Sequence, residues 1–382
     1  MKKITQSLLA CRTQNRYRSR EIMNSPQGVH VILENTPYLS FCSNDYLGLS
    51  NDERVKAAMI EGVGIYGVGS GAAHLITGHF EPHHDLELAL AKHTGRSRAL
   101  LFSTGYMANM GIIDALSERG DIVIQDKLNH ASLIDGSLYS RAALKRYKHA
   151  DMVDLENRLL HSAVDSPLIV TDGVFSMDGD IAPLEAISAL AEKYGARVLV
   201  DDAHGLGVLG ETGGGVCEML SLSKDDEPII MGTLGKAFGT FGAFVAGSEE
   251  LIEWLIQRAR TYVFTTALPP AMAMASLASL EIIQAEPQRR LHLDALIKKF
   301  RARVGDLGLT IMPSETPIQP IVVGDEKKAL SWSEKLRTQG ILVKAIRPPT
   351  VPEGTSRLRI TLSAAHSFDD VDRLLDELEK LA

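Results

Sequence analysis

Lys236 stands in a setting that surface lysines rarely occupy. It lies in the glycine-rich run 232–239 and follows the apolar stretch 228–231. Glycine lets a backbone approach a ligand closely, and the end of a buried strand fixes the direction of a side chain. A primary amine held in this way can form a Schiff base with an aldehyde. We therefore interpret Lys236 as the candidate for covalent binding of an aldehyde cofactor.

Acidic and imidazole side chains follow a second predicted strand, residues 197–200. Asp201, at the end of this strand, can pair with the nitrogen of a pyridine ring, which keeps the ring protonated and makes it an electron sink. His204 can then donate a hydrogen bond toward the phenolic oxygen of the same ring. Asp201 and Asp202 can equally cap the turn that follows the strand. This segment alone leaves both interpretations open.

A phosphate group has a candidate site in residues 103–109, which follow a predicted strand and begin a helix. Backbone N–H groups at a helix N-terminus bind anions, and Thr233 can add a hydroxyl. The ring of Tyr106 or of His130 can cover one face of an aromatic cofactor. A lone histidine is more often a packing residue, but the position of His130 in segment 127–132, shortly after a predicted strand, favours a role at the site.

The elements that must position these side chains follow an α/β pattern. Short apolar runs alternate with segments of helical spacing such as residues 184–194, and such runs are typical of strands buried in a parallel sheet. The pattern predicts a mostly parallel sheet with helices on both faces, in which ligands bind at the carboxyl ends of the strands. The predicted strands are residues 99–102, 121–124, 168–171, 197–200, 228–231 and 242–245.

The composition changes after the proline pair 269–270, where a long helix is predicted to run to about residue 286. Beyond this helix we expect a smaller α+β unit. We therefore divide the chain into an N-terminal segment (1–45), a large domain (46–285) and a small C-terminal domain (286–382). In the small domain we predict helices at 291–307, 328–338 and 368–381, and strands at 318–323, 342–346 and 357–362.

The overall composition excludes several classes of protein. The 382 residues carry a formal net charge of -8 and no basic patch, which argues against a nucleic-acid partner. The cysteines at 11, 42 and 217 have neither disulfide nor metal-ligand spacing, so we expect no metal and a cytoplasmic location. No apolar run approaches the roughly 20 residues of a membrane span. The N-terminus lacks the apolar core of an export signal, and we expect an amphipathic helix there.

Residues 205–210 match the G-x-G-x-x-G fingerprint of dinucleotide-binding proteins and follow a predicted strand. The next residues, 211–215, include consecutive glycines and make a poor opening for the helix that the fingerprint requires. A nicotinamide-dependent oxidoreductase is therefore the weaker interpretation. A non-catalytic protein that keeps the same fold is a further alternative, and it is disfavoured because the amine, carboxylate and imidazole of the candidate site occur together.

Taken together, several segments resemble the α-oxoamine synthases, which are pyridoxal-phosphate enzymes of the aspartate-aminotransferase-like fold (fold type I). In chain order they are residues 43–49, 103–106, 129–132, 172–179, 201–205, 233–236 and 349–359. Within that family, segments 345–352 and 361–366 most resemble the member of the biotin pathway. The resemblance implies an acyltransferase that condenses L-alanine with a pimeloyl thioester and releases carbon dioxide. The alternative assignments are sister enzymes that use glycine with an acetyl or succinyl thioester, or another acyl chain.

The resemblance also implies how the cofactor is held and used. Lys236 would carry pyridoxal 5'-phosphate and shuttle the proton at the substrate α-carbon. Asp201 would pair with the pyridinium nitrogen, and His204 would contact the ring oxygen. His130 would stack on the ring and polarise the new ketone. The remaining cofactor contacts would come from Ser176, Thr233, Gly105 and Tyr106.

Further implied residues bind substrate or a second subunit. Thr265 or Thr266 would reach the cofactor phosphate of a neighbouring subunit, which implies a homodimer with shared active sites. Asn44 and Arg359 would bind the carboxylate of the amino acid, with Thr350 nearby. These roles come from the resemblance and not from the spacing of the residues.

An N-terminal arginine is expected to meet the acyl thioester. Arg18 matches by ungapped spacing, with Arg20 as the alternative. The acyl carrier can be coenzyme A or acyl carrier protein. The negative net charge does not exclude coenzyme A, because local basic residues such as Arg18, Arg20 and Arg347 can bind it.

Overall fold

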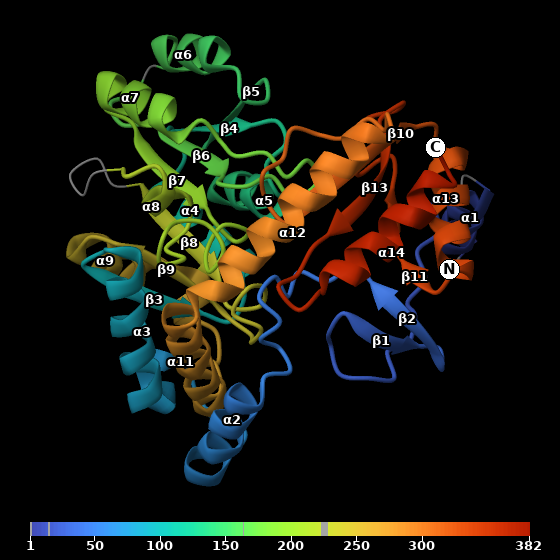
Figure 1. Ribbon diagram of the computed structural model, residues 1–382. Helices are drawn as coiled ribbons and strands as arrows, with labels where there is room; N and C mark the ends of the chain where they lie inside the picture. Colours follow the sequence, from blue (N-terminus) through green and yellow to red (C-terminus); the bar gives the residue numbers. More distant parts are fainter. Residues whose placement is uncertain (1, 14–15, 163, 223–227) are drawn as a thin grey trace.

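The computed structural model describes residues 2–13, 16–162, 164–222 and 228–382. Its centre is a seven-stranded sheet of order β3-β9-β8-β7-β6-β4-β5 (Figure 1). Neighbouring strands from β5 to β8 run parallel, and β9 runs antiparallel to both β3 and β8. The prediction of a mostly parallel sheet is confirmed. The strands are β3 (Arg98–Phe102), β4 (Ile122–Asp126), β5 (Ala143–Tyr147), β6 (Leu168–Asp172), β7 (Arg197–Asp201), β8 (Ile229–Thr233) and β9 (Ala243–Gly247).

Helices cover both faces of this sheet, as predicted. Successive strand residues face two separate cores: Leu101 packs in one and Leu100 in the other. Helices α3, α6, α7 and α11 contribute to the first core, and α4, α9 and α10 to the second. Each fully buried aliphatic side chain of this kind contributes about 1.5–3 kcal/mol. The helices are α2 (Glu53–Tyr66), α3 (Glu81–Thr94), α4 (Gly105–Leu116), α5 (Ala131–Ser140), α6 (Met152–Leu160), α7 (Leu184–Tyr194), α8 (Val216–Met219), α9 (Glu249–Arg258), α10 (Arg260–Val263) and α11 (Pro270–Ala285), with a π-helical turn η1 (His74–Gly78).

The C-terminal part of the chain builds a second, antiparallel sheet of order β10-β13-β12. The long helix α12 runs past this sheet in Figure 1, and both chain ends lie on the same side of the molecule. The elements are α12 (Pro287–Asp306), β10 (Ile318–Gly324), α13 (Glu326–Thr338), β11 (Ile341–Leu342), β12 (Lys344–Ile346), β13 (Ser356–Thr361) and α14 (Phe368–Glu379).

The N-terminal segment joins this part of the molecule. The expected helix is present as α1 (Lys2–Thr13), followed by the hairpin β1 (His30–Leu33) and β2 (Thr36–Ser40). Strand β11 pairs parallel with β2, whereas β12 pairs with β13. The prediction of one continuous strand over 342–346 is therefore wrong. The strand breaks at the buried Val343, and the parts before and after it belong to two different sheets. Among the described helices, none combines the length and apolarity needed to cross a membrane.

Candidate active site

A cavity of about 190 Å³ lies where the parallel strands end. Asp172, Asp201 and Thr233, the last residues of β6, β7 and β8, all line it. The first turn of α4 closes another side. The carboxyl edge of the sheet thus gathers side chains that lie far apart in sequence. The full lining is Gly105, Tyr106, Asn109, His130, Ser132, Asp172, Ser176, Asp201, Ala203, His204, Met231, Thr233 and Lys236.

Lys236 and His204 face each other in this cavity. The distance from Lys236 Nζ to His204 Nε2 is 2.8 Å. Burial lowers the pKa of Lys236 to about 8, although the charges of Asp201 and Asp172 oppose the shift. Burial and the charge of Lys236 hold the pKa of His204 well below its usual value. The imidazole of His204 is therefore neutral, and the lowered pKa of Lys236 makes its neutral, nucleophilic amine far more accessible near neutral pH than that of an exposed lysine.

The two adjacent aspartates have different surroundings. Asp201 lines the cavity, where its Oδ2 accepts a hydrogen bond from Asn109 Nδ2 at 2.7 Å and its Oδ1 accepts one from the Ala203 N–H. Asp202 points away from the lining and accepts from the Val216 N–H at 2.7 Å. Burial raises the pKa of Asp202 to about 8. Turn capping thus accounts for Asp202, while Asp201 also presents its carboxylate to the cavity.

Gly205, in the fingerprint at 205–210, and Gly215, which follows it, pack against the Asp202 carboxyl. A Cβ on Gly205 would lie 2.1 Å from Asp202 Oδ1, and one on Gly215 would lie 1.9 Å from Oδ2. The segment forms turns, and the helix that follows, α8, has only 4 residues and begins at Val216. The helix that a dinucleotide site requires is therefore missing from this described segment, as the sequence indicated.

His130 stands at the mouth of the cavity as the N-cap of α5. Its backbone N–H donates to Asp172 Oδ2 at 2.8 Å, and its Nδ1 lies 2.7 Å from Ser132 Oγ. The ring of Tyr106 lies edge-on to it, with 6.4 Å between the centroids. These contacts fix the His130 ring beside the cavity, which is the place that a stacking role requires. Burial and the charge of Asp201 raise the pKa of Asp172 well above its usual value.

The N-terminus of α4 provides the candidate phosphate site. Thr104 is the N-cap, and its Oγ1 accepts from the Met107 N–H at 3.2 Å. Gly105 and Tyr106, in the first turn, line the cavity. Thr233 lies opposite on β8, where its hydroxyl donates to the Gly242 carbonyl at 3.1 Å. A helix N-terminus attracts an anion through its dipole and its unpaired N–H groups.

Arg359 on β13 contacts two other predicted residues, Ser176 and Asn44. Its Nε donates to the Ser176 carbonyl at 2.7 Å, and its terminal nitrogens lie 3.3 and 3.4 Å from Asn44 Oδ1. Ser176 lines the cavity. On the same strand, Arg357 forms a buried ion pair with Asp178 and so holds the loop that carries Ser176. Both arginines thus tie the second sheet to the cavity.

Other predicted residues lie outside the cavity lining. Thr265 is half-buried and Thr266 exposed in the segment after α10, where Thr266 forms a bridge with Ala73. Thr350 is exposed in a turn in which its N–H donates to the Arg347 carbonyl at 3.1 Å. Arg18 and its alternative Arg20 are exposed between α1 and β1. The single chain does not bring these residues to Lys236.

Several residues of the site had no predicted role, and two of them hold the candidate groups directly. Asn109 holds Asp201, and Tyr46 places its hydroxyl 2.6 Å from His204 Nδ1. Tyr46 lies in segment 43–49, which was noted only for its resemblance. Asn109 lies inside helix α4 and Tyr46 in a loop, so neither side chain has a position whose chemical role the sequence alone reveals. Only the tertiary structure brings them to the site.

The lining residues fit pyridoxal phosphate. The cavity combines a buried amine of lowered pKa, a buried carboxylate, an aromatic ring at one face and a helix N-terminus. The amine can bind an aldehyde, and the carboxylate can pair with a pyridine nitrogen. The aromatic ring can stack on a flat ring, and the helix N-terminus can bind a phosphate. Asp201 is 5% exposed, so a charge on it is stabilised by a protonated ring nitrogen.

Comparisons with known proteins agree with this fit. A family model described as aminotransferase class I and II matches residues 36–378. The chain is 57% identical over 371 residues to an 8-amino-7-oxononanoate synthase of Pseudomonas syringae pv. tomato, a match that covers 97% of this chain and 93% of that protein. The solved 8-amino-7-oxononanoate synthase of Francisella tularensis matches with a TM-score of 0.79 and 33% identity, over 90% of this chain and 97% of that one. A serine palmitoyltransferase from S. paucimobilis, solved with a bound adduct of pyridoxal phosphate and myriocin, matches with a TM-score of 0.93 and 29% identity, over 99% and 96%.

Proposed function

The chain belongs to the aminotransferase class I and II family and, within it, to the 8-amino-7-oxononanoate synthases, and from this membership we propose that it condenses L-alanine with a pimeloyl thioester. It is a pyridoxal-phosphate-dependent acyltransferase of fold type I. The observation that carries the proposal is the Lys236 amine, held 2.8 Å from His204 in the cavity that Asp201 lines.

The side chains of the cavity have distinct proposed roles. When bound, pyridoxal phosphate supplies an electron sink for negative charge at the α-carbon of the amino acid. The Lys236 amine holds the cofactor and moves the α-proton, a task suited to a pKa of about 8. Asp201 keeps the ring nitrogen protonated, and Asn109 orients that carboxylate. His204 donates to the ring oxygen, and His130 covers the ring and polarises the carbonyl of the product.

We propose that the substrates enter from the side of the second sheet. Arg359 and Asn44 lie together beside Ser176 and offer donors to the carboxylate of L-alanine. Thr350 and Arg18, both exposed, would contact the substrates from the rim. The acyl donor is a pimeloyl thioester of coenzyme A or of acyl carrier protein.

We propose a homodimer with shared active sites. Large apolar side chains are exposed at Ile60 (72%), Val68 (84%), Ile76 (76%) and Phe264 (72%). The bridge between Ala73 and Thr266 places the turn η1 beside the segment that carries Phe264. Exposed apolar surface of this kind marks an interaction site, and a second copy of the chain is the commonest partner. Thr265 and Thr266, remote from the cavity of their own chain, would reach the cofactor phosphate of the partner subunit.

We further propose that the chain divides at about residue 286 into a large and a small domain after an N-terminal segment of 45 residues. The seven-stranded sheet uses residues before this point, and the β10-β13-β12 sheet uses residues after it.

We also propose a cytoplasmic location. This proposal rests on the scattered cysteines of the sequence.

Substitution of Lys236 tests the proposed function. Lys236→Ala should abolish thiol release from the pimeloyl thioester and leave a folded protein. Borohydride reduction of the wild-type enzyme with pyridoxal phosphate should label the peptide that contains Lys236. The control is Lys193→Ala, which removes an exposed lysine paired with Glu156 and should retain activity. Normal steady-state turnover in Lys236→Ala would refute the proposal.

A further inference from the structure

The Tyr46 hydroxyl completes a chain of polar contacts that runs through the imidazole of His204. Tyr46 Oη lies 2.6 Å from His204 Nδ1, and His204 Nε2 lies 2.8 Å from Lys236 Nζ. Tyr46 is fully buried, and its hydroxyl also contacts Asn44 Oδ1 at the long distance of 3.4 Å and the Arg359 side chain. Both imidazole nitrogens of His204 are therefore engaged, one by an amine and one by a phenol.

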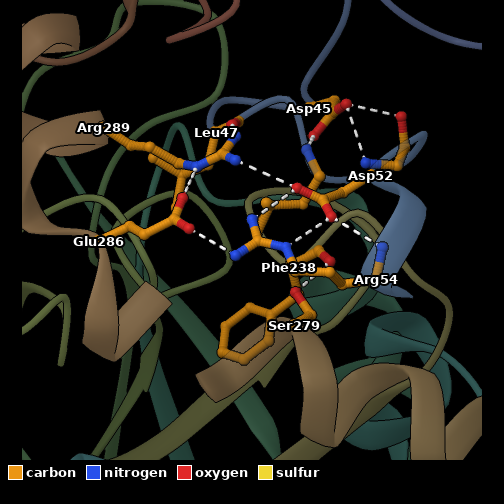
Figure 2. A network of polar contacts seen from close by, with 10 residues as sticks. Asp45, Leu47, Asp52, Arg54, Phe238, Ser279, Glu286 and Arg289 are labelled. Atoms are coloured by element: carbon orange, nitrogen blue, oxygen red, sulfur yellow. Dashed lines mark hydrogen bonds and ion pairs between the residues drawn. The ribbon is translucent and has the colours of Figure 1, made fainter. Parts of the chain in front are cut away.

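The backbone around Tyr46 is held firmly in place. Asp45 Oδ1 accepts from the Leu49 N–H at 2.9 Å, and the Leu47 carbonyl accepts from Arg289 at 2.9 Å. Figure 2 shows Arg289 in a network of polar contacts that also contains Glu286 and Asp52. This network ties the start of α12 to the loop of Tyr46. The phenol is thus presented to His204 from a fixed backbone.

The contacts of His204 permit two arrangements of its single proton. A neutral imidazole has one donor nitrogen and one acceptor nitrogen. If Lys236 is an ammonium, which has no acceptor, Nε2 must accept from it, and Nδ1–H then donates to the Tyr46 oxygen. If an acceptor such as the ring oxygen of pyridoxal phosphate lies opposite Nε2, Nε2 must carry the proton, and Nδ1 then accepts from the Tyr46 hydroxyl. A hydroxyl satisfies both arrangements because it can rotate to donate or to accept.

We propose that Tyr46 is a positioning residue whose hydroxyl stabilises His204 in both tautomers, so that Nε2 accepts from Lys236 before the cofactor binds and donates to the cofactor ring oxygen afterwards. This inference rests on the proposed function, because it takes the role of His204 from it. Tyr46 itself touches neither the cofactor nor the substrate. Its effect on both passes through the imidazole.

The charges around His204 keep its imidazole neutral in both arrangements. Burial and the positive charges that face it hold its pKa well below the usual value. Burial raises the pKa of Tyr46 to about 12, so the phenol keeps its proton. The groups that face His204 are Tyr46, Lys236, Arg359 and His130. The carboxylates whose charges act on Lys236 are Asp201 and Asp172, which line the cavity, and Asp202, which lies behind the lining.

Nitrogen NMR of the wild-type protein tests the proposal directly. The full-length chain is labelled with ¹⁵N in its histidine rings, and the His204 signals are assigned by their loss in His204→Gln. At pH 7 without cofactor the proton should lie on Nδ1, and after addition of pyridoxal phosphate it should lie on Nε2. The same tautomer in both states would overturn the proposal.

Tyr46→Phe isolates the hydroxyl. In the cofactor-loaded variant the His204 signals should show a mixture of tautomers, because nothing donates to Nδ1. The pH midpoint of the visible absorption change of the bound cofactor should rise by about one pH unit, since the ring oxygen loses part of its hydrogen bond. The matched control is Tyr194→Phe, which removes a hydroxyl bonded to Glu156 outside the cavity and should leave both readouts unchanged.

The outcomes separate this inference from the proposed function. If pyridoxal phosphate gives no visible chromophore with the wild-type protein, the proposed function and this inference both fall. If the chromophore forms but Tyr46→Phe keeps the wild-type tautomer and pH midpoint, the proposed role of Tyr46 is refuted and the proposed function is not. A loss of thermal stability without a change in either readout would show a purely structural role and would also overturn it. If Tyr46→Phe does not fold, the wild-type comparison can still overturn the proposal, because the same tautomer with and without cofactor would contradict it.

Discussion

The chemistry of single residues in this site depends on desolvation. Lys236 is surrounded by carboxylates that favour its charged form, yet burial outweighs them and lowers its pKa to about 8. The same burial keeps His204 neutral. A buried amine is thus available as a nucleophile near neutral pH, where an exposed lysine with a pKa of about 10.4 is almost fully protonated.

The rate of cofactor loading should report this lowered pKa. Because only the neutral amine attacks an aldehyde, the rate of covalent binding should rise about tenfold per pH unit below pH 8 and level off above it. The visible absorbance that grows after pyridoxal phosphate is added to the cofactor-free protein measures this rate. Lys236→Ala provides the background. A rate that still rises tenfold between pH 8.5 and 9.5 would contradict the lowered pKa.

The sequence located individual site residues where a strand end fixed their direction. Lys236, Asp201 and His204 follow predicted strands, and they meet in one cavity. Asn109 and Tyr46 could not be found in this way, because a buried helix position and a loop position carry no chemical signal in the sequence alone. The roles of Thr265, Thr266, Thr350 and Arg18 stay predictions, since the single chain does not bring them to Lys236.

At the scale of elements, the loop after β8 is positioned by contact with the loop before α2. Gly239 has a positive φ of +68°, and a Cβ on it would lie 2.3 Å from the Ser50 nitrogen and 2.5 Å from the Leu49 carbonyl carbon. Both are backbone atoms and cannot rotate away. The loop that carries Lys236 therefore needs glycine at position 239 to approach this closely.

Gly239→Ala should weaken cofactor binding. The added Cβ must push the loop of Lys236 away from residues 49–50, and the strained backbone adds to the cost, so we expect a loss of stability of about 2 kcal/mol and a rise of roughly tenfold or more in the Kd for pyridoxal phosphate. Cofactor titration followed by absorbance measures the Kd. Gly235→Ala is the matched control, because its Cβ would meet nothing nearer than 3.7 Å. Equal affinities in the two variants would contradict the packing argument.

Most elements could be predicted because buried strands are short and apolar. Strands β6 and β9 are buried along their whole length, and both had been predicted within a few residues. Strand β5 was missed because it lies at the sheet edge, where exposed Lys145 and Arg146 break the apolar pattern. The break at Val343 was missed because pairing with two different partners leaves no mark on the local sequence.

At the scale of the whole molecule, we propose that a second chain completes the active site. The cavity holds the candidate groups for the ring and the amine, while Thr265 and Thr266 lie elsewhere in an apolar, exposed region. A two-fold dimer uses the same surface twice and can therefore complete two sites at once. The affinity for pyridoxal phosphate should then be higher in the dimer than in the isolated chain.

Mixing two inactive variants tests this sharing. Lys236→Ala lacks the amine, and a double variant, Thr265→Ala with Thr266→Ala, should bind cofactor weakly in both sites. After the two are unfolded and refolded together in equal amounts, mixed dimers should contain one intact site, which restores roughly a quarter of wild-type sites. Thiol release at limiting pyridoxal phosphate measures the recovery. Each variant refolded alone is the control, and no recovery in a mixture shown to contain dimers would contradict shared sites.

The most direct test of the central claim is the choice of substrates. Thiol release and carbon dioxide evolution are measured across a grid of amino acids and acyl thioesters with the cofactor-loaded enzyme. We predict turnover for L-alanine with a pimeloyl thioester and little for other pairs, because the chain belongs to the 8-amino-7-oxononanoate synthases. Turnover with glycine and an acetyl or succinyl thioester, and none with L-alanine and the pimeloyl thioester, would contradict the assigned reaction.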